Sequence, residues 1–598
     1  MKRILVSMMV LGSVWISAQK KEGNIDEVIV QGKIISLPYK KVNENMIIVS
    51  KEEIQNSPAK SIEELMSQFT GMDIQRRGAN GVQSDISIRG GSFEQVLILI
   101  NGIRMNDSQT GHNNMNIPID LSNVERIEVI KGPAARRFGQ NAYAGVINII
   151  TKVNDKEEVR ISANGGDFET YNLGLAANFG TPKFSNFFQA NTSSSEGYRY
   201  NTDYKINNVW YQNNYAIQDG SIKLQAGFSE KKFGANGFYA SPVNQYEETQ
   251  VSLVSAAYQQ KLGNLNINSN VYWRRAQDMF LINRLKPELY RNMHIGNNLG
   301  GEINASYPSS LGITGLGVEL RKEFLVSNNL GNRNRWVTQV FLEHLFSFFD
   351  KKLQVSPGIS WANYSNAGNF FYPGLDVGVD VAENHKIYGN IARVHRVPSY
   401  TDLFYNDPNN EGNPYLKPEN AISYEVGYRF QTKDWLASAS AFGRNSNDAI
   451  DFVKQNSNEK WKTKNIGKVD TKGFEVVLQK NFQGFVKSVY AGYTFTDMKG
   501  TFEDNLYSKY ALQNLKHQLV GKLENKIFGF TNQLIYKYME RVTLGSYHLL
   551  DEKLSYDFKN LNLYVLINNV TNTQYTESNL VPMPGRWFHV GFTYKIGL

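Results

Sequence analysis

The sequence contains no cysteine, which removes one whole class of stabilising cross-links. No disulfide framework can support the fold, and a lipid anchor attached through an N-terminal cysteine is excluded. Histidine is scarce as well, with 8 residues among 598, and neither paired histidines nor thiols offer a tight metal cage. We therefore expect no intrinsic cofactor and no metal site.

Long hydrophobic runs are also missing. No stretch of about 18 apolar residues follows the N-terminus, which excludes a membrane-spanning helix. The N-terminus itself begins with Lys2 and Arg3, continues with apolar residues from Ile4 to Ile16, and reaches the small residues Ser17 and Ala18. This pattern predicts a cleavable export signal over residues 1–18, which takes no part in the mature fold.

Motifs for nucleic-acid binding and for hydrolysis are absent too. The net charge is +8, and the sequence pI is near 9.0. Lysine and arginine are nevertheless scattered without a basic stripe, so we expect no nucleic-acid partner. A Gly-x-Ser-x-Gly elbow and a His-Glu-x-x-His helix are both missing. An outer-membrane lipase or protease is therefore disfavoured, although a spatially assembled dyad would leave no such motif.

Alternation of apolar and polar residues is abundant from about residue 156 onward. One face of 171–179 carries Tyr171, Leu173, Leu175 and Phe179, and the chain ends on alternating residues from Phe588 to Leu598. Such strands cover a core in a soluble antiparallel sheet, whereas in an outer-membrane barrel they face lipid and a wet lumen. A barrel reconciles 12% aromatic residues with a mean hydropathy of −0.42, because only alternate residues contact lipid.

Residues 26–152 differ from this repetitive pattern and predict a small folded domain. Ser61 followed by Glu64 is a capping box that predicts the start of a helix, and Gly71 supplies its stop. The core face of this helix has helical spacing and consists of Ile62, Leu65, Met66 and Phe69.

Strand signals follow this predicted helix. The run from Val96 to Ile100 is apolar on both faces and closes on Asn101-Gly102, the dipeptide preferred in type I′ hairpin turns. A strand of that kind must be buried on both faces. The stretches SDISIRGG, VERIEVI and GVINIITK predict further strands, so this segment should be an α/β domain of about 125 residues with its own core.

The order of these motifs resembles the plug domain of TonB-dependent outer-membrane receptors. The resemblance runs through Ile88-Arg89-Gly90, Asn101-Gly102-Ile103, Ile127-Glu128-Val129, Lys131-Gly132-Pro133 and Gly145–Lys152. Residues 134–138 depart from the family pattern, which usually has a small or hydroxyl residue and a tyrosine there. Later segments are similar to the family's barrel, namely EGNPYLKPENAISYEVGYRF, NIGKVDTKGFEVVL, LINNVTNTQYTE and PGRWFHVGFTYKI.

The resemblance implies an all-β membrane protein: a 22-stranded antiparallel transmembrane β-barrel with a small α/β plug in its lumen. Residues 156–598 divided among 22 strands allow about 20 residues per strand and connection, and a tilted membrane strand needs about 9 to 11. We predict a signal peptide at 1–18, a Ton box and linker at 19–45, a plug at 46–155 and a barrel at 156–598. The terminal strand should close the barrel and act as its assembly signal, although Leu598 replaces the family's usual aromatic residue.

The segment IDEVIVQG, at residues 25–32, resembles a Ton box, the segment that TonB grips. Its β-prone run favours strand addition, in which main-chain hydrogen bonds provide the grip. The resemblance thus implies TonB as a partner, and we expect a monomer in outer-membrane lipid. An ordinary linker or a first plug strand is the alternative. The predicted Ton box residues are Asp26, Glu27, Val28, Ile29 and Val30.

Two polar loops of the predicted plug are candidates for binding a ligand. The stretch QRRGANGVQ lies between the helix and a strand, and NDSQTGHNNMNIP lies between two strands. Arginines there can pair with carboxylates or phosphates. The alternative for each residue is a solvated loop position. The candidate contacts are Arg76, Arg77, Asn80, Gln109, His112, Asn113 and Asn114.

The resemblance implies active import of a scarce metal chelate, either a ferric siderophore or cobalamin. Residues His395-Arg396-Val397-Pro398 faintly resemble a haem-receptor motif, but no histidine lies between them and NPYL at 413–416, where such a receptor would place one. His395 is therefore interpreted as a barrel or loop residue, and a haem receptor of the same family is kept as an alternative. A passive porin would lack the folded domain, and a soluble adhesin built from β-sandwiches would lack the plug motifs.

Overall fold

The computed structural model describes residues 34–133, 135–153, 156–239, 243–501, 506–578 and 581–597. The predicted signal peptide and the predicted Ton box, Asp26–Val30, lie outside these ranges. Among the described residues, no helix combines the length and the apolar character needed to cross a bilayer.

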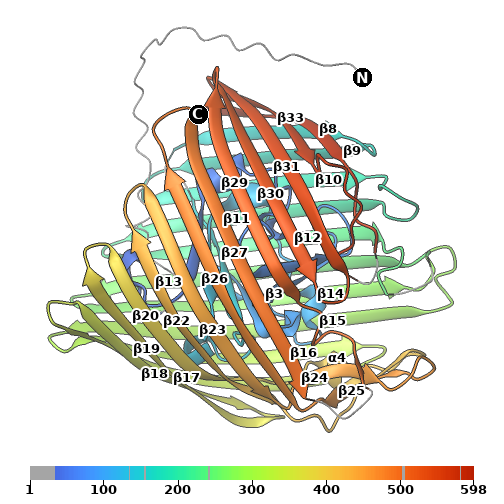
Figure 1. Ribbon diagram of the computed structural model, residues 1–598, viewed down its shortest axis with the longest axis horizontal. Helices are drawn as coiled ribbons and strands as arrows, with labels where there is room; N and C mark the ends of the chain where they lie inside the picture. Colours follow the sequence, from blue (N-terminus) through green and yellow to red (C-terminus); the bar gives the residue numbers. More distant parts are fainter. Residues whose placement is uncertain are drawn as a thin grey trace.

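Most of the chain forms a closed antiparallel barrel of 22 strands, as predicted (Figure 1). The last strand, β33 (Trp587–Gly597), pairs with the first, β8 (Glu158–Gly166), and so closes the cylinder. The other barrel strands are β9 (Thr170–Gly180), β10 (Phe184–Ser195), β11 (Tyr204–Ile217), β12 (Gly220–Gly234), β13 (Tyr246–Leu262), β14 (Leu265–Leu281), β15 (Arg291–Ser309), β16 (Gly312–Ser327), β17 (Arg333–Phe348), β18 (Leu353–Tyr364), β19 (Gly368–Ala382), β20 (His385–Arg396), β22 (Glu419–Gln431), β23 (Trp435–Asn447), β26 (Lys468–Asn481), β27 (Val486–Thr501), β29 (Leu515–Ile527), β30 (Phe530–Arg541), β31 (Gly545–Phe558) and β32 (Leu561–Asn568).

The alternation seen in the sequence becomes an outer and an inner face of the barrel wall. In β33, Val590 is 63% exposed and Phe592 is 37% exposed, whereas His589 between Phe588 and Val590 is 2% exposed. The outward side chains of β9, such as Leu173, are exposed in the same way. Apolar side chains therefore form the outer surface, as expected of a barrel that faces lipid.

The two ends of the barrel differ in their connections. At one end the strands are joined by short turns, such as 218–219, 263–264 and 559–560, and here β33 ends. At the other end the connections include 397–418, 448–467, 569–586 and the connection after β27, which is described at 506–514. These carry α4 (Tyr400–Phe404) and a small sheet in the order β21 (Asn410–Glu411), β25 (Trp461–Asn465), β24 (Ile450–Lys454), β28 (Tyr507–Ser508). We refer to the two ends of the barrel as the short-turn end and the long-loop end.

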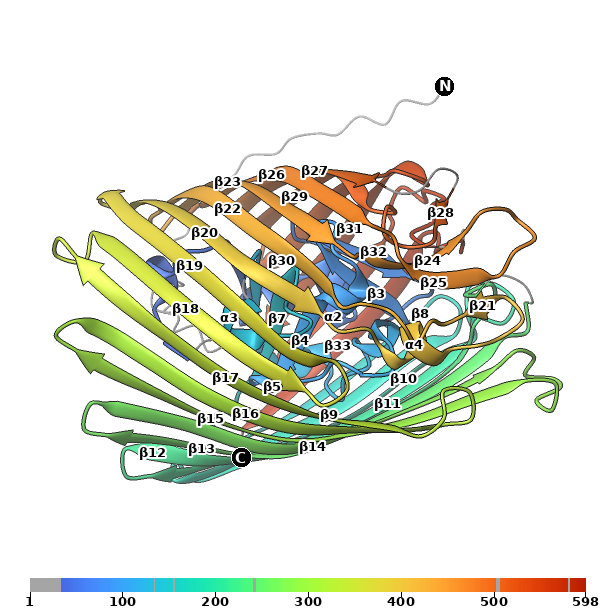
Figure 2. The ribbon, with the colours of Figure 1, turned by 90° about the horizontal axis from the view of Figure 1, so that it is seen from below.

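The N-terminal domain fills the lumen of the barrel, and its blue elements are enclosed by barrel strands in Figure 2. Its main sheet has the order β1-β6-β7-β4-β5, with β4 parallel to β7 and the other pairs antiparallel. The elements of this plug are β1 (Met46–Ser50), α1 (Lys51–Asn56), α2 (Ile62–Met66), β2 (Met72–Arg76), β3 (Ser84–Ile88), β4 (Val96–Ile100), β5 (Ile103–Arg104), β6 (Val124–Lys131), α3 (Ala135–Phe138) and β7 (Gly145–Thr151).

Local predictions for the plug are confirmed at its core strand. Every residue of β4 is at most 1% exposed, because the strand lies between β5 and β7 at the centre of the domain. Asn101 and Gly102 have φ values of 51° and 84°, as a type I′ turn requires, and they join β4 to β5.

The predicted helix is shorter than its apolar pattern suggests, since α2 ends at Met66. Ser61 caps it by accepting a hydrogen bond from the Glu64 amide. The Glu64 carboxylate does not complete the predicted box, because it accepts the amide of Lys60 instead. Phe69 is still buried, so the apolar spacing identified the core face correctly while the helix boundary was wrong.

Four charged residues join the plug to the barrel wall in one buried cluster. Lys131 Nζ lies 2.5 Å from Glu475 Oε1, and Arg89 Nη2 lies 3.1 Å from Glu425 Oε1. Arg89 Nε also approaches Glu475 Oε2 at 3.6 Å, so Glu475 bridges both cations. Each side chain is at most 3% exposed. A buried charge is tolerated only when it is paired, so this cluster fixes the position of the plug against β22 and β26.

Candidate ligand-binding site

A cavity of about 70 Å³ lies between the plug and the connections at the long-loop end. The plug contributes residues around the start of β4, including Phe93, Glu94 and His112. The barrel contributes residues from β20, β22, β23 and β26, and the long connections contribute α4, β24 and Tyr510. This cavity, which we call the apical cavity, is smaller than the roughly 300 Å³ of a typical small-molecule pocket. A large ligand could enter it only after the long connections have moved.

The long connections close over the plug through direct hydrogen bonds. The backbone amides of Tyr400 and Thr401 in α4 donate to the carbonyl oxygens of Ser108 and Gln109, each at 3.0 Å. Gln75 donates to the carbonyl oxygen of Gln513 at 3.3 Å. The plug surface and the connections above it are therefore one continuous assembly in this closed arrangement.

Among the predicted contact residues, His112 lies at the apical cavity. Its ring stacks on Phe93 with centroids 4.0 Å apart, and Tyr510 approaches its edge at 5.7 Å. Its Nδ1 lies 2.7 Å from Asp85 Oδ1. Burial lowers the pKa of His112 even though Asp85 acts in the opposite direction, so the ring is neutral at neutral pH. A neutral ring in an aromatic stack is suited to packing against an apolar or planar ligand.

The neighbouring predicted residues hold their loop in place. The side chains of Gln109 and Asn113 both donate to Asp278 Oδ2 of β14, each at 3.3 Å. Asn114 accepts the amide of Asp107 at 3.0 Å and donates to the Phe93 carbonyl. All three are less than 10% exposed. The structure therefore places them beside the apical cavity, where they support the loop that presents His112.

The two predicted arginines are paired with carboxylates of the protein itself. Arg77 Nη2 lies 2.8 Å from Asp85 Oδ2, and Arg77 is 1% exposed. Arg76 donates to Glu577 through its Nε at 2.9 Å and its Nη2 at 2.6 Å. Burial acts to raise the pKa of Glu577, but the adjacent Arg76 outweighs it and holds that pKa below its usual range.

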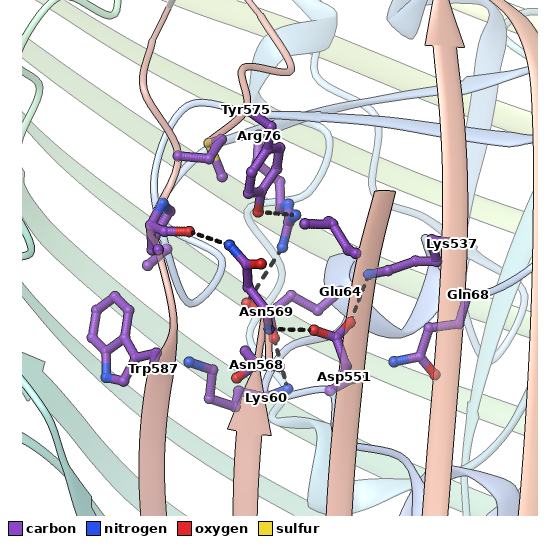
Figure 3. Close-up of a pocket in the computed structure, with 16 residues that line it drawn as sticks. Lys60, Glu64, Gln68, Arg76, Lys537, Asp551, Asn568, Asn569, Tyr575 and Trp587 are labelled. Carbon is purple, nitrogen blue, oxygen red and sulfur yellow. Dashed lines mark hydrogen bonds and ion pairs between the residues drawn. The ribbon is translucent and has the colours of Figure 1, made fainter. Parts of the chain in front are cut away.

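Arg76 lines a second cavity of about 30 Å³ between the plug and the barrel wall (Figure 3). There it points toward Tyr575, whose hydroxyl accepts from Arg76 Nη2 at 3.3 Å. Because Tyr575 and Glu577 both lie in connection 569–586, Arg76 ties this connection to the plug. The remaining predicted residue is Asn80, whose side chain donates to the hydroxyl of Tyr204 in β11. The backbone of Asn80 has a positive φ of 55°.

Sequence reasoning missed the charged residues of the apical cavity, which come from distant parts of the chain. These residues are Glu94, Arg396, Asp402, Glu419, Arg444 and Asp451. The barrel residues among them occupy inward positions of strands whose side chains alternate between the two faces. Arg396 and Glu419 also lie in the quoted segments 395–398 and 411–430, whereas Arg444 had no signal beyond this alternation. Burial, together with the nearby Asp402, raises the pKa of Glu94 to about 8, so its carboxyl group is mostly protonated at neutral pH.

A transmembrane barrel whose lumen is filled by a separately folded domain defines a plugged-barrel class of membrane protein. A family model described as "TonB dependent receptor-like, beta-barrel" matches residues 152–570, and one described as "TonB-dependent Receptor Plug Domain" matches residues 38–146. Together they cover most of the sequence. The chain therefore belongs to the TonB-dependent receptors.

The chain is similar to individual transporters and receptors over nearly its whole length. The chain is 25% identical over 630 aligned positions to the vitamin B12 transporter BtuB of Vibrio vulnificus, an alignment that covers 97% of each chain. The ferric enterobactin receptor PfeA of Pseudomonas aeruginosa superimposes with a TM-score of 0.75 at 15% identity, covering 93% of this chain and 100% of that one. The FrpB iron transporter of Neisseria meningitidis gives 0.77 at 16% identity, covering 92% and 99%. The two structural similarities concern the fold.

Proposed function

We propose that the protein imports a metal chelate, of the cobalamin or ferric-siderophore class, across the outer membrane in a TonB-dependent process. The observation that carries the proposal is the apical cavity, which lies between the plug and the long connections of a family member. Because outer-membrane barrels have short turns on the periplasmic side and longer loops outside, this cavity faces the exterior. The chelate binds there before the plug moves.

The energy for import comes from TonB, which grips the predicted Ton box at Asp26–Val30. The buried ion pairs between the plug and the barrel wall oppose spontaneous opening of the lumen. An outer membrane has no ATP and no sustained ion gradient, so the work of rearranging the plug must be supplied across the periplasm. This reasoning disfavours a passive porin, whose lumen would conduct without any input of work.

Full-length similarity to a vitamin B12 transporter supports cobalamin as the first chelate to test. The haem alternative receives less support from the geometry around His395. Its ring lies 5.4 Å from both Phe370 and Tyr372, measured between centroids, and it does not line the apical cavity.

Growth of a deletion strain tests the proposed function directly. We expect loss of growth when a cobalamin or a ferric siderophore is the limiting nutrient, with restoration by the intact gene only when TonB is functional. Loss of growth on limiting haem alone would favour the haem-receptor alternative. Liposomes containing the purified protein should not swell in small sugars. Free permeability, or growth that is independent of TonB, would contradict active import.

Replacing both Gln109 and His112 by alanine is expected to weaken binding of the transported chelate about tenfold. The change removes the stacked ring and a hydrogen bond that supports its loop, and each hydrogen bond is worth about 1 kcal/mol. Titration of the purified protein measures the dissociation constant. Asn116→Ala, in the same loop and outside the cavity lining, is the matched control. An unchanged dissociation constant in the double variant would remove this loop from the site.

A further inference from the structure

Arg444 is a buried cation of the apical cavity that forms no ion pair with a carboxylate of the described residues. It lies on β23 and is 6% exposed, at an inward position between Phe442 and Ser446. Its cross-strand neighbours are Ser423 and Thr471, which carry no charge. Among the described residues, none forms a hydrogen bond or an ion pair with its guanidinium group. The ring of Tyr143 lies 5.5 Å from the guanidinium carbon.

The other cation of the cavity, Arg396, shows the contrast. Its Nη1 lies 3.0 Å from Asp402 Oδ2, and its Nη2 lies 2.8 Å from Glu419 Oε1. Both terminal nitrogens of Arg396 are thus paired with carboxylates, and its Nε is buried inside the wall without a hydrogen-bond partner among the described residues. Glu419 is also fully occupied, since it accepts the Ile450 amide at 2.6 Å and the side-chain amide of Gln95 at 2.8 Å. The carboxylates of Asp402 and Glu419 are therefore both engaged by other groups and do not pair with Arg444.

Two further acids line the cavity: Glu94 accepts the Gly111 amide at 2.7 Å, and Asp451 is engaged in its own loop. Asp451 accepts hydrogen bonds from the backbone amides of Phe452, Tyr510 and Ala511 and from the hydroxyl of Ser508. These bonds hold β24 against the connection that follows β27. Arg444 therefore presents unused donors to the cavity, where a planar guanidinium can bind two oxygens of one anionic group.

The charge balance of the cavity limits how many such groups can be accepted. Asp402, Glu419 and Asp451 are carboxylates of the same wall. Arg396 already forms ion pairs with the first two of them. A ligand with several negative charges would face these carboxylates with a single free cation to offset them. Like charges in a water-poor site repel strongly, so a polyanionic chelate is disfavoured.

We propose that Arg444 binds a single anionic oxygen group of the transported chelate, and that the apical cavity thereby favours a chelate with one such group over a polyanionic chelate. This proposal rests on the proposed function of the cavity. A phosphodiester or a carboxylate satisfies the chemistry. Cyanocobalamin carries one phosphodiester, cobinamide lacks it, and ferric enterobactin carries several negative charges, so these three probes separate the cases.

The test compares wild type with Arg444→Gln by titrating the purified, barrel-folded protein with each probe. We expect wild type to bind cyanocobalamin more tightly than ferric enterobactin. Arg444→Gln should weaken cyanocobalamin binding by at least about tenfold, as expected for a lost charge-assisted contact, and change cobinamide binding by less than about twofold. Arg393→Gln makes the same chemical change at an outward position of β20 and should alter neither affinity.

Several outcomes would overturn the proposal. An equal loss of affinity for cyanocobalamin and for cobinamide in Arg444→Gln would mean that Arg444 only supports the structure. Heat-modifiable migration of the variant on gels verifies that its barrel is closed. Tighter binding of ferric enterobactin than of cyanocobalamin would reject the charge argument while leaving chelate import intact. If wild type bound none of the probes and the deletion strain grew normally, the proposed function itself would fail along with this assignment.

Discussion

Replacing Val28 by proline is expected to abolish uptake of the chelate while leaving its binding unchanged. Strand addition depends on main-chain hydrogen bonds, and proline removes one donor and fixes φ. The apical cavity is built from residues 90 onward, far along the chain from Val28, so the affinity should not change. Uptake of labelled chelate by whole cells measures the first effect, and titration of purified protein measures the second.

Val28→Ala is the matched control, because alanine keeps the backbone N–H and the freedom of φ. We expect this variant to retain most of the wild-type uptake. Normal uptake by the proline variant would show that TonB does not grip the chain through a strand at this position.

The architecture of the plug indicates where a pull on the N-terminal segment would act first. Residues 34–45 contact the barrel wall, for example through Val42, whose carbonyl oxygen accepts from Arg429. They lead directly into β1, which lies at the edge of the plug sheet and, among the described strands, pairs only with β6. Force applied ahead of residue 34 therefore reaches an edge strand before it reaches the buried strands β7 and β4.

Replacing Glu475 by glutamine is expected to loosen the seated plug severely. Glu475 bridges Lys131 and Arg89, and both cations are buried against it. Removing one partner of a buried ion pair typically costs about 3 to 5 kcal/mol, because the other charge stays unpaired. We expect faster proteolysis of the plug and increased entry of large antibiotics into cells, measured against wild type.

Two further variants show whether this effect arises in the cluster itself. Adding Lys131→Met to Glu475→Gln should cost less than the sum of the single changes, because the unpaired cation is removed. Glu230→Gln on β12 removes a partly exposed carboxylate outside the plug interface that pairs with Lys232 at 3.2 Å, and it should cost at most about 1 kcal/mol. A fully additive double variant would contradict a coupled cluster.

Local structure was predictable wherever one physical rule dominated. The unbroken apolar run of β4 can only be buried on both faces, and Asn101-Gly102 can only suit a turn with positive φ at both residues. The capping box was half right, because Ser61 caps α2 as expected while Glu64 bonds to Lys60. Side chains close in sequence compete for the same amides, and single-residue spacing does not decide which contact forms.

The candidate site was less predictable, because its charges pair across long sequence separations. Arg76 and Arg77 have the chemistry of anion-binding residues, yet their partners are Glu577 and Asp85 of the protein. Arg444 gave no sequence signal beyond strand alternation, although it lines the apical cavity and forms no ion pair within the part of the chain that the structure describes. Residue type states what a side chain can bind, whereas the surrounding charges decide whether it is still free to bind a ligand.

By itself the sequence determined the membrane barrel, the folded domain ahead of it and the local turns, because alternation, apolar runs and turn residues act over a few positions. The tertiary structure alone decided which charges meet. The cluster of Arg89, Lys131, Glu425 and Glu475, and the free guanidinium of Arg444, exist only once the plug lies inside the barrel. Electrostatic pairing depends on distance in space, and closing a cylinder around a folded domain brings together residues that are hundreds of positions apart in the sequence.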